Sequence, residues 1–425
     1  MLHLFKNIII NSPVDEINGK YDLLINSGII ENIGQDLWHP DAEIVESDGI
    51  TCVPGFFDMH VHFREPGQTH KENNLSGIAS AANGGFTGVL CMPNTSPPID
   101  NEHLLKQLYD QVKDQAVNVY FTGCVSEKRE GKELTNLKNL FEAGAKAFTD
   151  DGSPVYDENV LNGALKISAE LHTMIVQHSE DMKISDGGVI NKGSVSERIG
   201  VKGIPVESEV SVFVRDISIA DKISNSRFHI QHISCGKTVE LLRDIRKKNN
   251  LITGEACPHH FILTEDECLK SGTNAKMNPP LRTQSDVDSI LEGLKDGTID
   301  VICTDHAPHT EEEKNKGFEK APFGIVGLET SVGLAYTYLV LKNIITFEEM
   351  IFKMSVNPRR MLGLEPVHIK VGSTANLTFL ETDKKWTVDK SKFKSKSSNT
   401  PFNDYELMCK PYAIYNNSKY ILSDL

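Results

Sequence analysis

The strongest constraint on the fold of this chain is an alternation, from about residue 56 onward, of short apolar runs with amphipathic segments. Eight runs have the character of buried strands: Phe56–His62, Phe86–Met92, Val117–Cys124, Ala145–Asp150, Thr173–His178, Phe228–Ile233, Leu251–Ala256 and Ile299–Asp305. Strands that alternate with helices predict a parallel sheet, and eight of them close a (β/α)8 barrel. An open doubly wound sheet usually has G-x-G-x-x-G after its first strand, whereas HFREPG follows here. We therefore predict an α/β fold with a TIM-type (β/α)8 barrel.

Helical periodicity fills the gaps between these runs. The segment Asn101–Gln115 has leucine or valine at positions 104, 108 and 112, and Asp100 is its expected N-cap. The segment Leu134–Ala143 ends at Gly144, a residue type favoured just after a helix. The same pattern recurs in Asn159–His172, Val206–Lys222, Thr238–Lys248 and Asp286–Lys295.

The two ends of the chain are different in character. They contain short β-like runs separated by turn residues: Phe5–Ile10, Leu23–Ile25, Ile29–Ile33, Ala375–Leu380, Tyr412–Tyr415 and Tyr420–Leu422. Because each end alone is too small for a core of its own, we predict one β-module built from residues 1–54 and 366–425. Residues 55–365 form the predicted catalytic barrel. The stretch Lys390–Lys396, within DKSKFKSKSS, is expected to form a solvated loop, since four lysines interleaved with serines leave no apolar face.

Composition excludes several classes of protein. The 44 Lys and Arg against 59 Asp and Glu give a net charge of −15, which argues against a nucleic-acid binder. No segment has the length and apolarity of a membrane span, and the N-terminus lacks the basic region and cleavage site of a signal peptide. The 8 cysteines are scattered without a C-x-x-C pair, as expected for reduced thiols in a cytoplasmic protein.

The most informative local pattern is His60-Val61-His62 at the end of the first predicted strand. Residues i and i+2 of a strand point to the same face, so both imidazoles would project into the mouth of the barrel. Two neutral imidazoles on one face are a natural pair of zinc ligands. Two ordinary histidines at a turn are the alternative.

Other predicted strands also stop at an ionisable residue. Asp150 ends the fourth run and Asp151 follows it, while His178 lies at the end of the fifth, His232 near the end of the sixth and Asp305 at the end of the eighth. One such residue is most simply a polar residue at the start of a loop. Several together at one barrel mouth would be costly to bury without a compensating ion, so the pattern predicts a metal site.

The motifs that surround these residues resemble those of the dihydroorotases, in the class I branch of the amidohydrolase superfamily. The segments that carry the resemblance are PGFFDMHVHFREPGQTHKE from Pro54, CMPNTSPPID from Cys91, FTDDGSPV from Phe148, CPHHFILTED from Cys257, KMNPPLR from Lys276, DGTIDVICTDHAPHT from Asp296 and EKAPFGIVGLET from Glu319. They occur in order over essentially the whole chain. The family fold is a (β/α)8 barrel with a small β-module from both termini, which agrees with the independent reading of the strands.

The resemblance implies two zinc ions, although relatives differ in whether one or both sites are occupied. His60 and His62 would hold one zinc with Asp305, while His178 and His232 would hold the second. Many amidohydrolases bridge their metals with a carboxylated lysine, and Lys146 is the only lysine nearby. The T-D-D-G motif matches the branch that uses aspartate instead. Either aspartate of the pair could serve, and the motif favours Asp151 as the bridge, with Asp150 structural.

The resemblance also implies an activity: reversible hydrolysis of the cyclic amide of (S)-dihydroorotate to N-carbamoyl-L-aspartate, the third step of de novo pyrimidine (UMP) synthesis. Asp305 would be the catalytic base and then acid. The substrate-binding residues implied by the family are His62, Arg64, Asn94, Asn278, His309, Phe323 and Gly324. Arg64 also suits a substrate carboxylate by its planar fork, and a surface salt bridge is the alternative.

Several further residues receive simpler interpretations. Thr310–Lys320 is expected to be a solvated charged loop rather than a lid over the mouth. His259 and His260 are candidates to donate hydrogen bonds to the ligands, and His306 to orient Asp305 or neighbouring loops. His229 has the opposite strand parity to His232 and is not expected to be a ligand.

Two other functions compete with this prediction. One is a hydantoinase, dihydropyrimidinase or allantoinase, which would usually carry the lysine bridge and lack the REPG and FTDDG combination. The other is a catalytically silent homologue that acts as a scaffold for aspartate transcarbamoylase, although such relatives typically lose metal ligands. The family resemblance leaves a homodimer and a complex with aspartate transcarbamoylase open for an active enzyme.

Overall fold

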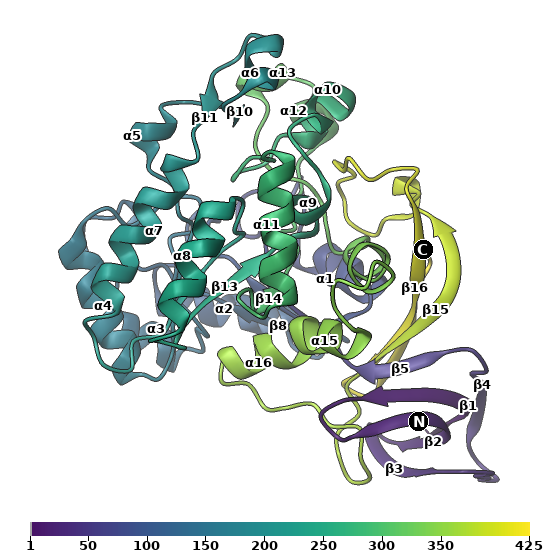
Figure 1. Ribbon diagram of the computed structural model, residues 1–425. Helices are drawn as coiled ribbons and strands as arrows, with labels where there is room; N and C mark the ends of the chain where they lie inside the picture. Colours follow the sequence, from purple (N-terminus) through teal and green to yellow (C-terminus); the bar gives the residue numbers. More distant parts are fainter. Residues whose placement is uncertain (1) are drawn as a thin grey trace.

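The computed structural model describes residues 2–425 and consists of a barrel of parallel strands with a separate sheet beside it (Figure 1). The regular barrel strands are β6 (Phe56–Val61), β7 (Phe86–Cys91), β8 (Asn118–Phe121), β9 (Ile175–Gln177), β12 (Phe228–Ile230), β13 (Ile252–Ala256) and β14 (Val301–Ile302). They pair in parallel in two groups, β6–β7–β8 and β9–β12–β13–β14. Each strand lies inside one of the predicted runs.

Single parallel bridges join the two groups into a ring. Phe148, in the middle of the fourth predicted run, bridges to Gly123 after β8 and to Ile175 of β9. At the other junction, Val61 of β6 bridges to His306 after β14. The fourth member is therefore a short extended segment, not a regular strand, and with it the ring has eight members. The predicted (β/α)8 barrel is confirmed.

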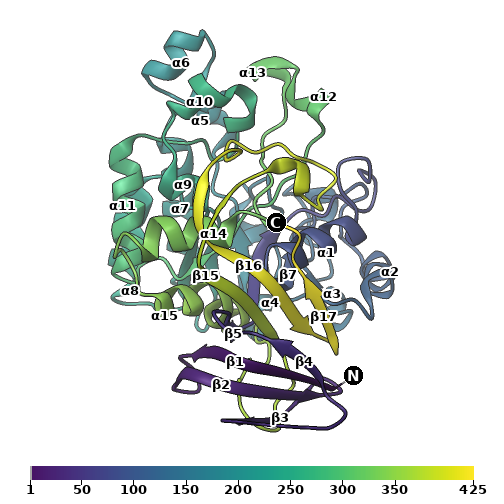
Figure 2. The same ribbon diagram turned by 90° about the vertical axis from the view of Figure 1, so that its right-hand side faces the viewer.

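Helices cover the outside of the ring (Figures 1 and 2). They are α1 (Asn74–Asn83), α2 (Glu102–Val112), α3 (Leu137–Glu142), α4 (Glu158–Glu170), α7 (Glu207–Ala220), α8 (Gly236–Arg246), α11 (Gln284–Lys295), α14 (Ser331–Ala335), α15 (Phe347–Ile351) and α16 (Asn357–Met361). Each predicted helical segment overlaps one of them. None of the helices within residues 2–425 is long and apolar enough to cross a membrane.

The predicted N-cap of α2 is wrong by one residue. The side chain of Asn101 accepts a hydrogen bond from Leu104 N at 3.0 Å and so caps the helix. Asp100 instead accepts one from Lys128 N at 3.0 Å. Aspartate and asparagine are comparable N-caps, so the residue left free by the neighbouring loop takes that position.

Shorter elements follow the carboxyl ends of the barrel strands and lengthen the loops there. They are α5 (Met182–Ser185), β10 (Ile190–Asn191), α6 (Ser194–Ile199), β11 (Gly203–Ile204), α9 (Pro258–Ile262), α10 (Glu267–Ser271), α12 (Glu311–Lys314) and α13 (Gly317–Lys320). Strands β10 and β11 pair in parallel. Most of these elements lie at the top of Figure 1, so this end of the barrel is the more elaborate one.

The separate sheet is built from both ends of the chain. It contains β1 (Leu2–Ser12), β2 (Ile17–Asn26), β3 (Ile29–Gly34), β4 (Glu43–Glu46), β5 (Thr51–Pro54), β15 (Leu377–Thr387), β16 (Glu406–Asn416) and β17 (Lys419–Leu422). The strand order is β17-β16-β15-β5-β1-β2-β3, with β4 beside β1. Because β5 pairs with both β1 and β15, it connects the two termini, as expected for a shared β-module. The division into residues 1–54, 55–365 and 366–425 stays a prediction.

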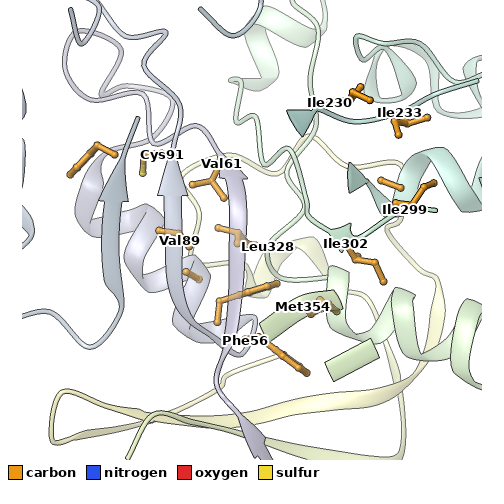
Figure 3. Close-up of a cluster of buried hydrophobic side chains, with 14 of the residues drawn as sticks. Phe56, Val61, Val89, Cys91, Ile230, Ile233, Ile299, Ile302, Leu328 and Met354 are labelled. Atoms are coloured by element: carbon orange, nitrogen blue, oxygen red, sulfur yellow. The ribbon is translucent and has the colours of Figure 1, made fainter. Parts of the chain in front are cut away.

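Each part of the fold has its own buried core. Figure 3 shows part of the barrel core, where Phe56 of β6 lies near Met354, and Val61, at the other end of the strand, lies toward Cys91 of β7. In the terminal sheet, the rings of Phe5 in β1 and Phe379 in β15 are stacked with centroids 5.0 Å apart. Side chains from opposite ends of the chain therefore stabilise one another.

The stretch Lys390–Lys396 is only partly the solvated loop that was predicted. Lys390 and Lys392 are exposed, but the chain then turns back toward the barrel. Lys394 N donates to Glu329 Oε1 at 2.6 Å, and Ser397 Oγ donates to Lys71 O at 2.8 Å. The lysine-serine pattern hid this docking, because it uses backbone amides and small hydroxyls and no apolar face. We call residues 393–400 the C-terminal strap.

Replacing Phe5 with alanine tests the contact between the two ends. Loss of a fully buried phenylalanine is expected to lower the free energy of unfolding by about 3–5 kcal/mol, measured by urea denaturation. Trp38→Ala is the control, because Trp38 is 76% exposed and its loss should change stability by about 0.5 kcal/mol or less. Equal stability of the two variants would contradict the proposed coupling of the termini.

Candidate active site

The six predicted metal ligands meet at the end of the barrel where the strands finish. They are His60, His62, Asp151, His178, His232 and Asp305, and all are at most 8% exposed. Because parallel strands all end on the same side, their last side chains share one mouth. Residues separated by up to 245 positions along the chain are thereby brought together.

One group of potential ligands comes from β6 and the segment after β14. Asp305 Oδ1 lies 2.9 Å from His62 Nε2 and 3.4 Å from His60 Nε2. One donor atom from each of these three residues lies within 4.8 Å of the other two. This spacing suits side chains that bind a single ion.

A second group adjoins the first through Asp151. Its Oδ1 atom lies 3.6 Å from His60 Nε2 and 3.9 Å from His178 Nδ1. His178 Nδ1 is in turn 2.9 Å from His232 Nε2. Lys146, the candidate for a lysine bridge, has its Nζ over the ring of Tyr120 at 5.7 Å. The residue in contact with both groups is therefore an aspartate.

The electrostatics of the cluster favour an added cation. Burial alone would lower the pKa of His60, but the carboxylates of Asp305 and Glu255 raise this pKa well above its usual value. Burial alone would raise the pKa of Asp151, but His60 and His62 hold it well below its usual value. The cluster therefore attracts positive charge, which a divalent ion would supply in place of protons.

The donor set fits a divalent metal. Four buried imidazoles and two carboxylates are ligands that zinc and similar ions bind. Burial, together with neighbouring His178 and His60, holds the pKa of His232 well below its usual value, so this ring is neutral. A neutral imidazole keeps the lone pair that a metal needs.

Glu255 of β13 was not recognised in the sequence as part of the site. It is buried, and its Oε1 atom accepts a hydrogen bond from His60 Nδ1 at 2.6 Å. Its other oxygen, Oε2, lies 3.1 Å from His229 Nε2. The carboxylate thus fixes the ring of His60 with Nε2 facing Asp305. A charged residue inside the apolar run LITGEA was the available signal.

Asn94 connects two of the ligands. Its Oδ1 atom lies 2.8 Å from His62 Nδ1, and its Nδ2 atom donates to Asp151 Oδ2 at 2.9 Å. The predicted substrate contact therefore also orients the ligand cluster. Glu180 is another residue that the sequence analysis missed, and its Oε2 atom lies 3.3 Å from His178 Nε2.

Asp150 faces away from the cluster. Its Oδ1 atom accepts hydrogen bonds from Val125 N at 2.9 Å and Ser126 N at 3.1 Å. These contacts are those of a residue that holds a neighbouring loop. The adjacent aspartates thus point in different directions.

The other histidines near the mouth have structural contacts. His306 Nδ1 accepts a hydrogen bond from Gly327 N at 3.2 Å, so His306 orients a neighbouring loop and has no hydrogen bond to Asp305 within the described chain. His260 Nε2 donates to Pro279 O at 2.9 Å. Neither His259 nor His260 has a hydrogen bond to a predicted ligand in residues 2–425, so the prediction that they support the ligands is not met.

A cavity of about 320 Å³ opens beside the ligand cluster. Its lining includes every predicted substrate-binding residue: His62, Arg64, Asn94, Asn278, His309, Phe323 and Gly324. The ligands Asp151, His178, His232 and Asp305 also line it. A molecule in the cavity would therefore touch both sets of residues.

Arg64 is a buried cation in this cavity, not a surface salt bridge. Its Nη2 atom lies 3.2 Å from His309 Nε2, and its Nε donates to Pro308 O at 3.3 Å. Burial lowers the pKa of Arg64 to about 10, so the guanidinium stays charged. Within residues 2–425 it forms no ion pair with a carboxylate, which leaves it available for an anionic group.

Three residues at the site have left-handed backbone conformations. The φ angles are 60° at Arg64, 29° at His232 and 49° at Asp305. Such angles are costly for residues with a side chain, and they cluster at functional sites. Non-glycine residues elsewhere in the described chain also have positive φ angles, so these three angles describe how the backbone turns at the mouth.

The segment Thr310–Lys320 is more ordered than predicted. Several of its charged residues are exposed, but Lys314 of α12 is only 2% exposed. Its Nζ atom donates to Pro322 O and Gly324 O, both at 3.0 Å. The prediction of a solvated loop is therefore wrong for Lys314, which can be buried because backbone carbonyls satisfy its ammonium.

Comparison with known proteins identifies close relatives along nearly the whole chain. A family model described as Dihydro-orotase-like matches residues 49–238. A dihydroorotase of Acetivibrio thermocellus is 41% identical over 413 residues, which cover 97% of each chain. A dihydroorotase of Carboxydothermus hydrogenoformans is 44% identical over 384 residues, which cover 90% of this chain and 89% of the other.

Solved structures with the same fold are more distant in sequence. A dihydropyrimidinase of Brevibacillus agri has a TM-score of 0.86 and 20% identity, and the match covers 100% of this chain and 95% of that one. An L-hydantoinase of Arthrobacter aurescens has a TM-score of 0.84 and 23% identity, with 100% and 96% covered. At this level of identity the likeness establishes the fold.

The barrel, the ligand cluster at its mouth and these relatives define a metal-dependent cyclic amidohydrolase. Within that class, the identity of 41% and 44% to dihydroorotases over most of the chain identifies the family. The chain belongs to the dihydroorotase family. The resemblance inferred from its motifs is thereby confirmed. The family implies a divalent metal, and the grouped imidazoles and carboxylates at the mouth are candidate ligands for it.

Replacing Glu255 with glutamine tests the support of His60. Loss of this carboxylate is expected to weaken metal binding about 10- to 100-fold, because the ring of His60 loses its charged partner. Metal content after chelator competition, measured by mass spectrometry, is the readout. Glu292→Gln, on the exposed face of α11, is the control. Equal retention of metal by the two variants would contradict the role of Glu255.

Proposed function

We propose that this chain catalyses the reversible hydrolysis of the cyclic amide of (S)-dihydroorotate to N-carbamoyl-L-aspartate, the third step of de novo pyrimidine synthesis. The observation that carries the proposal is the buried Arg64, without a carboxylate partner in the described chain, in the same cavity as the imidazole–carboxylate cluster. A substrate with both a carboxylate and a ring amide would satisfy both features. The names of the full-length relatives support the same substrate.

We propose zinc as the metal, with two ions in each chain. His60, His62 and Asp305 would hold one, His178 and His232 the other, and Asp151 would be shared between them. The predominance of imidazoles among the donors supports zinc over calcium or magnesium. Bound zinc supplies a Lewis acid that lowers the pKa of a water from about 15.7 to about 7 and polarises a carbonyl.

Asp305 is the proposed proton-transfer group. As a base it accepts a proton from the attacking water, and as an acid it gives this proton to the departing ring nitrogen. In ring closure the same steps run in reverse. The 2.9 Å contact between Asp305 Oδ1 and His62 Nε2 supports this role, because it fixes the carboxylate beside the cavity.

Arg64, Asn94 and His309 are proposed to bind the substrate carboxylate. Burial and the charges of Arg64 and Lys71 hold the pKa of His309 well below its usual value, so its ring is neutral and the positive charge resides on Arg64. Asn278 and the backbone at residues 323–324 would contact the ring amide. These groups orient the ring relative to Asp305 and exclude water from the cavity.

We propose a cytoplasmic location and leave two partners to experiment. All eight cysteines are free and buried, which supports a reducing compartment. Family resemblance alone supports a homodimer or a complex with aspartate transcarbamoylase. Light scattering of the purified chain, with and without that enzyme, measures both associations.

A substrate panel tests the proposed function. Metal-loaded protein is expected to hydrolyse dihydroorotate with a kcat/KM about 10³-fold or more above that for hydantoin, dihydrouracil or allantoin, because these leave Arg64 unpaired. Thorough chelation should abolish the activity, and added zinc should restore it. Hydrolysis of hydantoin or allantoin without turnover of dihydroorotate would contradict the assignment. Metal-loaded protein inactive on all four would support the scaffold alternative.

Replacing Asp305 with asparagine tests the proton transfer. The kcat for dihydroorotate is expected to fall about 10²- to 10⁴-fold, because the amide cannot act as a base. Metal content is measured in the same preparation, since asparagine retains one oxygen donor. Asp288→Asn, an exposed position on α11, is the control. Near-normal turnover by the Asp305 variant would defeat the assignment.

A further inference from the structure

The C-terminal strap is attached to the barrel by two buried carboxylates. Glu329 accepts hydrogen bonds from Lys394 N at 2.6 Å and from Ser395 N at 3.3 Å. Glu72, which precedes α1, accepts one from the Ser395 hydroxyl and one from Lys396 N at 3.3 Å. The strap therefore has a defined position against the barrel, although it belongs to the connection between β15 and β16 of the terminal sheet.

Asn399, near the end of the strap, joins two loops of the cavity wall. Its Oδ1 atom accepts a hydrogen bond from His309 N at 3.1 Å. Its Nδ2 atom donates to Ala307 O at 3.2 Å and to Gly324 O at 3.0 Å. The side chain is 4% exposed and uses one oxygen and both amide hydrogens in these contacts.

The two joined loops are in close contact at Gly324. Its φ angle is 124°, and a Cβ atom at this position would lie 2.6 Å from Ala307 Cβ. The Gly324 carbonyl accepts hydrogen bonds from Lys314 Nζ and from Asn399 Nδ2, each at 3.0 Å. Ala307 N also donates to Ile325 O at 2.8 Å, so the loops are joined at this point without Asn399. A shift of Asn399 would therefore act on the local positions of His309 N and Gly324 O, which its side chain holds.

We infer that Asn399 is a positioning residue for the substrate, contributed by the C-terminal strap. The inference rests on the proposed function, which assigns the substrate carboxylate to His309 and the ring amide to residues 323–324. A rigid ring must meet both contacts at once, so the distance between the loops sets how well it binds. None of the three side-chain hydrogen bonds of Asn399 involves a predicted metal ligand.

This role differs from that of a residue needed only for folding. A purely structural residue would change the thermal midpoint, metal content and activity together. Asn399 is expected to act mainly on KM, because the loops it joins contact the substrate and not the metal. The exchange of the His309 amide hydrogen should also depend on Asn399, since Oδ1 is its acceptor.

The experiment compares Asn399→Ala and Asn399→Asp with the wild-type holoenzyme. Both should raise KM for dihydroorotate about ten-fold or more, with kcat changed less than about three-fold and zinc content unchanged. Aspartate should raise KM more than alanine does, because it retains the acceptor for His309 N but places a negative charge against two carbonyls. Lys392→Ala, at an exposed position of the same connection between β15 and β16, is the control.

Hydrogen exchange provides a readout that does not depend on the substrate. Peptides that contain His309 should exchange faster in Asn399→Ala than in wild type or Lys392→Ala, with barrel peptides unchanged. Unchanged KM, or exchange that is unaltered at His309, would overturn the inference. A fall in metal content and thermal midpoint without a rise in KM would also overturn it. Failure of the proposed function is distinguished by a wild-type enzyme that does not turn over dihydroorotate.

Discussion

The structure depends on the compensation of buried charge at one end of a barrel. Imidazoles and carboxylates from five strand ends lie in a mouth with almost no solvent exposure, where an unpaired charge is expensive. Each buried imidazole or carboxylate is tolerated because a hydrogen-bonding or oppositely charged side chain lies within a few ångströms, as Glu255 does for His60. A closed ring of strands is what brings these groups together, so the fold and the site share one physical requirement.

Buried polar groups around the site are also satisfied by nearby partners. Glu255 and Asn94 orient the histidines of β6, and Glu72 and Glu329 use buried carboxylates to hold backbone amides of the C-terminal strap. At Lys314 the buried charge is positive instead, and its ammonium donates hydrogen bonds to backbone carbonyls. Polar groups in this protein therefore determine where loops lie, while apolar contacts such as Phe5 with Phe379 hold the larger elements together.

Sequence patterns predicted the elements whose information is local. Alternating apolar runs located the barrel strands, and the two-residue spacing of His60 and His62 put both on one face. Glu255 was missed because its partner, His60, is 195 residues away and only barrel closure brings them together. The docking of the strap was missed for the same reason, since Lys396 and Glu72 are 324 residues apart. The irregular fourth strand and the burial of Lys314 likewise depend on neighbours that no local pattern specifies.

The position of β5 has a consequence for how the chain folds during translation. Strand β5 is made early, but its antiparallel partner β15 begins only at Leu377. Until that segment leaves the exit tunnel, one edge of β5 has no hydrogen-bonding partner, and the two loops of the cavity wall lack the hydrogen bonds of Asn399. Completion of the terminal sheet and of the catalytic mouth is thus postponed to the last stage of translation.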